Sequence, residues 1–178
     1  FCIIEMGANH KHEITLLCSI ARPDISIITN ANNAHLGEFG SEENLVKAKG
    51  EILESLTKDG KAIINNTSPH KEIWKKISGT ESVSYFGDGS SVFATNIEEF
   101  KYHTNFNLHF QSQSININLS MIGLHQVENA LAASACAIKL GIEPELIKNG
   151  LENTLPEKGR LELIEIEDFK ILDDTYNA

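Results

Sequence analysis

Cysteine is scarce in this sequence, which has only three in 178 residues: Cys2, Cys18 and Cys136. Their number is odd, no two follow the C-x-x-C spacing, and their neighbours are apolar. This pattern argues against a disulfide framework and predicts reduced, buried thiols, which is the usual state of cysteine in the cytoplasm. We therefore expect a cytoplasmic protein.

Long hydrophobic runs and an excess of positive charge are also lacking. No apolar run approaches membrane-spanning length and no signal-peptide pattern is present, so we expect no membrane insertion. The 25 acidic residues outnumber the 15 basic ones and give a formal net charge of −10. This charge argues against a general nucleic-acid surface, although a few local donors and a metal can still bind a phosphorylated ligand.

Hydrophobic residues make up an ordinary 41% of the chain, which is enough for a core. The length suits one domain with part of a second. Residues 1–4 begin inside an apolar segment without an initiator Met, and the last residues directly follow a predicted strand. We therefore expect the chain to be a segment of a longer protein.

The order of apolar runs and helix signals predicts an α/β fold. In the first half, short apolar strands alternate with helices, which is typical of a mostly parallel sheet flanked by helical crossovers. The predicted elements are a buried strand at 1–4, a helix at about 12–20, a strand at 25–29, a helix from Ser41, a strand at 61–65, a helix from Pro69 to about 77 and a strand at 83–86.

The pattern then changes, because residues 92–120 alternate between apolar and polar side chains. Such alternation predicts a small antiparallel meander with one solvated face. A long helix follows at 125–140, with alanines and leucines nearly all the way round, so we expect it to be buried. Pro144 begins a short helix that ends at about 149.

The end of the chain reads as a linker and the beginning of another domain. Residues 151–160 form the linker, and two strands at 161–166 and 169–172 flank a tight turn. We therefore predict a central domain over residues 1–155 and the first strands of a second α/β domain over residues 156–178.

The loop before Ser41 is the first candidate site. Ligands of open α/β sheets bind beyond the carboxyl ends of the strands, where this loop is expected to lie. Ser41 is a good N-cap, and the helix that follows has an apolar stripe that contains Lys49. A buried lysine must find a partner, lose its proton or be chemically changed. The alternative is that Lys49 extends along the apolar face to water.

Glu5 and His35 follow the first and second predicted strands, so a parallel sheet would bring both to one edge. A carboxylate and an imidazole can hold a divalent cation there, and Mg²⁺ is favoured where phosphate is bound. Without further motifs, a glutamate in the position of Glu5 is more often a helix cap or a solvated residue than a metal ligand.

Four short motifs surround these residues: Asn30, Ala34-His35-Leu36, Phe39-Gly40-Ser41 and Lys47-Ala48-Lys49-Gly50-Glu51. Together they resemble the central, ATP-binding domain of the Mur ligases, a family of ATP-dependent amide ligases of cell-wall precursor synthesis. The resemblance implies that Glu5 and His35 contact Mg²⁺. It also implies that CO₂ carbamylates Lys49, which turns a buried cation into an anion that can reach the metal.

A further motif, Gly123 to Ala133, resembles the adenine-handling helix start of the same family, G-x-H-N-x-x-N-x-x-A-A. The resemblance implies that His125 packs beside the base and that Asn129 reads its edge. Gln126 departs from the family pattern, in which Asn is usual, but keeps the amide. The alternative is that His125 and Asn129, which share a helix face, only cap a core helix.

The last motif, Asp173 to Ala178, resembles the D-D-T-Y-N-A of those family members that add a dipeptide, D-alanyl-D-alanine. The resemblance implies that Asp174 meets the ribose of the nucleotide, and Asp173 could share that role. Arg160, after Gly159, matches the family arginine that contacts the ATP phosphates, a use that suits its five donors.

The resemblance implies a complete reaction for the parent protein, which we expect to be a monomer. The ligase would use ATP to join UDP-N-acetylmuramoyl-tripeptide to D-alanyl-D-alanine through an acyl phosphate, with Lys49, His35 and Arg160 in catalytic roles. The two substrates are bound with the help of domains that this chain does not contain.

Two features depart from the family pattern. The Gly-rich phosphate loop of G-T-x-G-K-T type does not occur in these 178 residues, so we predict that the chain alone is inactive. His12 stands where the family commonly has Gly before Glu13-Ile14, and we expect both His10 and His12 to be exposed.

Two other functions stay open. A sister ligase, such as another Mur ligase or folylpolyglutamate synthase, would share Glu5, His35 and Lys49 but differ in its acceptor, although the motif that begins at Asp173 argues against it. Alternatively, the chain could be a non-catalytic nucleotide-binding or interaction domain.

Overall fold

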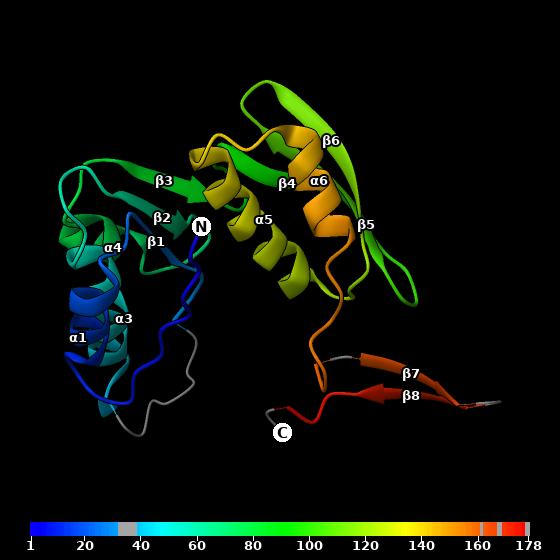
Figure 1. The fold of residues 1–178 in the computed structure, drawn as a ribbon, viewed down its shortest axis with the longest axis horizontal. Helices are drawn as coiled ribbons and strands as arrows, with labels where there is room; N and C mark the ends of the chain where they lie inside the picture. Colours follow the sequence, from blue (N-terminus) through cyan, green and yellow to red (C-terminus); the bar gives the residue numbers. More distant parts are fainter. Residues whose placement is uncertain (32–38, 161, 167–168, 177–178) are drawn as a thin grey trace. The chain divides into compact units, whose positions relative to one another are not determined.

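The computed structural model describes residues 1–31, 39–160, 162–166 and 169–176. The chain forms two compact units, Phe1–Ser91 and Val92–Ala178 (Figure 1). The first unit contains a parallel sheet and the second an antiparallel sheet, so the predicted α/β fold with an antiparallel meander is confirmed.

The parallel sheet of the first unit has three strands in the order β1-β2-β3. The strands are β1 (Ile25–Ile28), β2 (Lys61–Asn65) and β3 (Val83–Phe86). Helix α1 (Glu13–Ala21) precedes β1, and helices α3 (Glu42–Glu54) and α4 (Lys71–Ile77) connect the strands; all three lie to one side of the sheet (Figure 1). Short apolar strands and intervening helices therefore occur in the predicted order.

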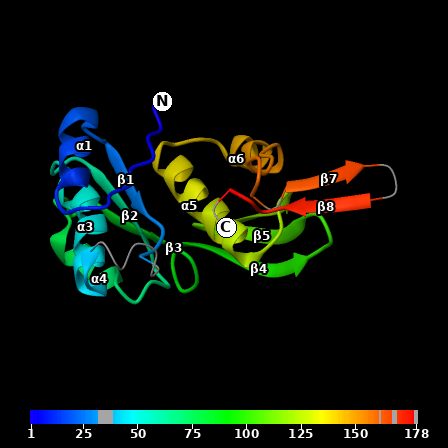
Figure 2. The ribbon, with the colours of Figure 1, turned by 90° about the horizontal axis from the view of Figure 1, so that it is seen from below.

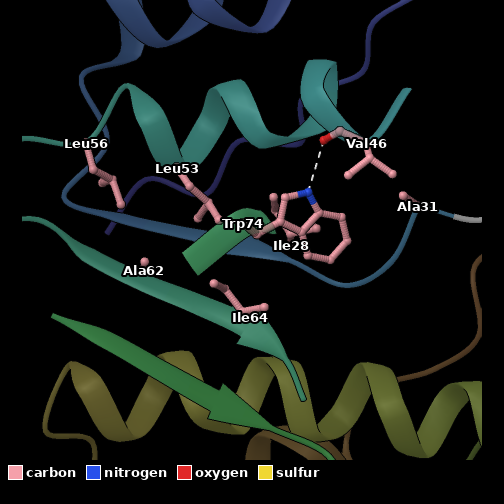
Figure 3. Packing of buried hydrophobic residues seen from close by; sticks show 8 residues of the cluster. All are labelled: Ile28, Ala31, Val46, Leu53, Leu56, Ala62, Ile64 and Trp74. Carbon is pink, nitrogen blue, oxygen red and sulfur yellow. Dashed lines mark hydrogen bonds between the residues drawn. The ribbon is translucent and has the colours of Figure 1, made fainter. Parts of the chain in front are cut away.

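The core of this unit lies between α3, α4 and the sheet. Trp74 on α4 is fully buried at its centre, and its indole Nε1 donates a hydrogen bond to the carbonyl oxygen of Val46 on α3 at 3.0 Å (Figure 3). The indole therefore satisfies its one polar group while its ring fills the space between the two helices. The buried side chains around it are Ile28, Ala31, Val46, Leu53, Leu56, Ala62 and Ile64.

The predicted buried strand at residues 1–4 is wrong. No strand is present there, and Phe1 and Ile3 are 96% and 95% exposed. A strand gains its hydrogen bonds from a neighbour, and none of the described strands pairs with this segment, so its apolar composition alone does not make it a strand. Cys2 is exposed for the same reason, whereas Cys18 is buried as predicted.

The second unit begins with a three-stranded antiparallel meander in the order β4-β5-β6. Its strands are β4 (Val92–Glu99), β5 (Thr104–Phe110) and β6 (Gln113–Leu119), which confirms the prediction for residues 92–120. Along β5, buried and half-buried residues alternate, as expected for a sheet with one covered face. The covering helices are α5 (Leu124–Lys139) and α6 (Pro144–Glu152), which lie along the meander (Figure 2).

Two helix predictions need correction. Helix α5 is not buried all the way round, because His125, Glu128 and Asn129 in its first two turns are exposed, and only one stripe faces the meander. Pro69 does not begin α4; His70 is the N-cap, and Pro69 lies in the turn before it. Among the described residues, no helix is both long and apolar enough to cross a membrane.

The chain ends in a two-stranded antiparallel sheet formed by β7 (Glu162–Ile166) and β8 (Phe169–Asp173). The ladder pairs Glu162 with Asp173 and Ile166 with Phe169. The residues just before β7 and just after β8 are therefore brought together at the open end of this hairpin.

Candidate functional site

Lys49 occupies the buried stripe of α3, as the sequence predicted. Its side chain is half-buried, and its Nζ donates a hydrogen bond to the carbonyl oxygen of Asn30 at 3.2 Å, just beyond the end of β1. Burial lowers the pKa of the Lys49 amine below its ordinary value. The amine therefore finds a partner at the carboxyl edge of the sheet and is also easier to deprotonate.

The start of α3 explains how Lys49 reaches this position. The Ser41 side chain accepts a hydrogen bond from the backbone N–H of Asn44 at 3.2 Å, which is the predicted N-cap. Asn44 in turn donates from its side chain to the carbonyl oxygen of Phe39 at 2.9 Å. These contacts fix the first turn, and Lys49 lies two turns further along the helix.

The other two predicted metal ligands, Glu5 and His35, stay untested as partners of Lys49. Glu5 is exposed and does not follow a strand, and His35 lies outside the described residues. Within the described ranges, no group of three or more His, Cys, Asp or Glu residues could hold a metal ion. The magnesium site therefore stays a prediction.

Glu51 is a residue that the sequence reasoning missed. Its carboxylate is buried and accepts hydrogen bonds from the backbone N–H groups of His12 (2.8 Å) and Thr15 (3.1 Å) and from the Thr15 hydroxyl (3.0 Å). Glu51 thus caps α1 from the neighbouring helix, because the N-cap residue itself, His12, makes no side-chain cap. The only hint in the sequence was that Glu51 lies next to the apolar stripe of α3.

His12 has a backbone conformation that glycine adopts more readily than histidine. Its φ of 71° lies in the left-handed region, which favours glycine. The backbone N–H points to Glu51, while the imidazole is 84% exposed. The prediction that His12 and His10 are exposed is therefore confirmed.

The motif from Gly123 to Ala133, named the adenine motif after the role that the resemblance implies, begins at the exposed start of α5. The N-cap is Gly123, with φ 104°, and no side chain caps the helix, so His125 and Asn129 are not capping residues. The His125 ring lies so close to Gly123 that a Cβ there would be 2.6 Å from its Cε1. Asn129 Nδ2 donates a hydrogen bond to Gln126 Oε1 at 3.3 Å. Gln126, which differs from the family motif, therefore pairs its side-chain amide with that of Asn129, which matches the motif.

Arg160 and the D-D-T-Y motif lie together at the open end of the β7-β8 hairpin. Asp173 Oδ1 accepts hydrogen bonds from the backbone N–H of Thr175 (3.1 Å) and from its hydroxyl (2.7 Å). Asp174 is exposed, and no hydrogen bond or ion pair involves its side chain in the described part of the chain. This difference favours Asp174 as the carboxylate that is open to a ligand.

Comparisons with known proteins find relatives that match along the whole chain. A curated relative, UDP-N-acetylmuramoyl-tripeptide–D-alanyl-D-alanine ligase of Haemophilus influenzae, is 41% identical over the whole chain. A crystal structure of MurF from Acinetobacter baumannii superposes with a TM-score of 0.93 at 38% identity, over 98% of this chain and 39% of that one. MurF of Thermotoga maritima in complex with ADP, at 24% identity and a TM-score of 0.81 over 98% of this chain and 40% of that one, shares the fold.

The chain covers only part of these proteins, since it spans 39% of the length of the Haemophilus relative. The family model that describes the Mur ligase middle domain matches residues 1–137, which include Lys49 and the adenine motif. On this match, the chain belongs to the Mur ligase family.

Proposed function

We propose that the full-length protein is an ATP-dependent amide ligase of peptidoglycan precursor synthesis. It joins D-alanyl-D-alanine to UDP-N-acetylmuramoyl-tripeptide, acts in the cytoplasm and is a monomer. The observation that carries this proposal is the match over the whole chain to a relative whose name specifies both substrates. The match includes the motif that begins at Asp173, where the resemblance is most specific for the acceptor.

We assign residues 1–155 to the central ligase domain and residues 156–178 to the start of the next domain. In this assignment, ATP binds through His125, Gln126 and Asn129 at the base, Asp174 at the ribose and Arg160 at the phosphates. The paired amides of Gln126 and Asn129 keep donors and acceptors that suit the edge of an adenine. ADP bound to the Thermotoga relative supports a nucleotide site in this fold.

The environment of Lys49 fits the proposed metal site. Carbamylation requires the neutral amine, which attacks the carbon of CO₂ and releases a proton to form an N–C bond and a carboxylate. Burial favours that neutral form, so Lys49 is suited to this reaction. Glu5, His35 and carbamylated Lys49 together would supply oxygen and nitrogen ligands, and bound Mg²⁺ would offset the repulsion between two anionic substrates.

In the reaction itself, the tripeptide carboxylate attacks the γ-phosphorus of ATP, and the bond to ADP breaks to give an acyl phosphate. The amine of the dipeptide then attacks the acyl carbon, and phosphate leaves as the amide forms. Arg160 would direct its fixed, permanently charged donors at the transferred phosphoryl group, where negative charge is spread over three oxygens. The Asn30 carbonyl would hold Lys49 in place before carbamylation.

Phosphate release by the full-length protein tests this function. ATP, Mg²⁺, bicarbonate and UDP-N-acetylmuramoyl-tripeptide are supplied with and without D-alanyl-D-alanine. We expect release that depends on the dipeptide, and a product heavier than the tripeptide substrate by the dipeptide less one water.

The other outcomes separate the alternatives. Release that depends on a single amino acid or on glutamate would identify a sister ligase with a different acceptor. A folded protein that releases no phosphate with any acceptor would overturn the ligase assignment and leave a nucleotide-binding or interaction domain.

A further inference from the structure

Two segments that are far apart in the sequence meet at the open end of the β7-β8 hairpin. The backbone N–H of Tyr176 donates to the carbonyl oxygen of Gly159 at 2.9 Å, beyond the last ladder pair, Glu162 with Asp173. The turn held by Asp173 and Thr175 directs Tyr176 back to this position. The residue next to Gly159 is Arg160, so the motif and the arginine are joined through the backbone.

Gly159 permits this close approach. Its φ is +73°, a conformation that side chains disfavour. A Cβ at this position would lie 3.3 Å from the Tyr176 nitrogen and 3.4 Å from the Thr175 hydroxyl oxygen, which is tighter than most such contacts. The backbone conformation therefore favours glycine, and the absence of a Cβ leaves room for the approach of the turn.

The Arg160 guanidinium lies over the ring of Tyr176, with Cζ 4.0 Å from the ring centroid. A stacked guanidinium is held by its flat face, and its N–H donors remain free at the edge of the plane. In the part of the chain that the structure describes, no carboxylate forms an ion pair with Arg160. Both side chains are exposed, so the donors face solvent rather than a protein partner.

From this geometry we infer that Tyr176 is a positioning residue that stacks on Arg160 and aims its in-plane donors at the phosphate groups of the nucleotide. The inference deepens the proposed function and rests on it, because it assumes that Arg160 meets those phosphates. Without the ring, the long arginine side chain would sample many rotamers and would lose that freedom only on binding. The ring therefore reduces the entropic cost of binding phosphate.

Isothermal titration of the full-length protein with ADP and MgCl₂ tests the inference. An exposed cation–π contact predicts that Tyr176→Leu weakens ADP binding about two- to fivefold. Tyr176→Phe keeps the ring and should bind like the wild type, and Tyr176→Trp should bind at least as tightly, because tryptophan is the best cation–π partner. Phe169→Leu removes another exposed aromatic side chain from the same hairpin and should have no effect.

A double-mutant cycle separates positioning from a structural role. In an Arg160→Ala background, Tyr176→Leu should leave ADP affinity unchanged, because no guanidinium remains to be held. In an Arg160→Lys background, which keeps the charge without the plane, Tyr176→Trp should improve binding less than it does beside arginine.

Three results would overturn the inference. One is wild-type affinity in Tyr176→Leu, and another is an equal loss with and without Arg160. The third is a wild-type protein that does not bind ADP with Mg²⁺, which would overturn the proposed function as well. The first two results leave the proposed function intact, so the two failures can be told apart.

Discussion

Glu51 joins two helices through one buried carboxylate. It accepts three hydrogen bonds from the start of α1, and two of the donors are backbone N–H groups that have no partner within their own helix. The segment at the start of α1 is therefore fixed from α3, the helix that also carries Lys49. A substitution at Glu51 should act on this segment without touching a substrate.

We predict that Glu51→Ala loosens α1 selectively. Loss of hydrogen bonds to a buried charge typically costs about 2 kcal/mol, so amide hydrogen exchange in α1 should become about 30-fold faster in the full-length protein. Glu43→Ala is a matched control on the same helix, because the Glu43 side chain is exposed and forms a surface ion pair with Lys47. Unchanged exchange in α1 of Glu51→Ala would contradict the capping role.

Lys49 gives a prediction about pH. Burial lowers its pKa from 10.5, so the folded state binds fewer protons than the unfolded state between the lowered pKa and 10.5. This group therefore favours folding more as the pH rises through that window. Competitive acylation of the full-length protein in CO₂-free buffer, read by mass spectrometry, should show Lys49 half-deprotonated at a pH below 10.5.

Bicarbonate supplies the second half of this test. If CO₂ carbamylates Lys49, added bicarbonate should protect its amine from acylation and leave exposed Lys47 as reactive as before. If the pH midpoint of Lys49 acylation were at or above 10.5, burial would not lower the pKa of this amine. If bicarbonate protected Lys47 and Lys49 equally, the carbamate would not be selective for Lys49.

A glycine just after α4, Gly79, packs against the end of α3. The Gly79 N–H donates to the carbonyl oxygen of Leu53 at 3.0 Å, near the end of α3. A Cβ on Gly79 would overlap the carbonyl oxygen of Leu56 and lie 2.8 Å from that of Glu54. Both neighbours are backbone atoms, which cannot rotate away as a side chain can.

We expect Gly79→Ala to lower the free energy of unfolding by about 1–3 kcal/mol through this overpacking. A Cβ on Gly150, inside α6, would meet no atom within 4 Å apart from the backbone of its own helix. Gly150→Ala should therefore be neutral or stabilising by up to about 1 kcal/mol. Calorimetric melting of the two variants beside the wild type would check this. Equal melting temperatures of the two variants would contradict overpacking at Gly79.

Helices and strands that are marked by a local sequence pattern were predictable from the sequence. Ser41 marked the start of α3, and the alternation along residues 104–110 marked β5, because capping and side-chain alternation are local properties. Residues 1–4 were mispredicted because a strand also needs a neighbour. The exposed first turns of α5 were mispredicted because the expectation rested on the alanines and leucines of the helix, whereas the exposed residues at its start, His125, Glu128 and Asn129, are polar.

Part of the candidate site followed from the sequence as well. Helical periodicity alone placed Lys49 on the buried stripe, which the structure confirms. The roles of Glu51 and Tyr176 could not be predicted, because each depends on a contact with a segment that is 36 to 39 or 17 residues away. Such contacts are set by tertiary packing and leave no periodic signal.

At the scale of the whole molecule, the chain holds parts of a site but not the phosphate loop. No G-K-T sequence occurs in its 178 residues, and backbone donors of such a loop cradle the phosphates of a nucleotide. We therefore predict that the 178-residue chain alone neither hydrolyses ATP nor forms an amide. Phosphate release by the purified chain, measured beside the full-length protein as the positive control, would contradict this.

The burial of Trp74 has an optical consequence. It is the only tryptophan in the sequence, and its indole is sealed from water between α3 and α4 (Figure 3). Its fluorescence should be blue-shifted and resistant to quenching by iodide as long as these helices stay packed. In the isolated chain, tryptophan emission would thus report on the first unit alone, and melting of the second unit would pass unseen by that signal.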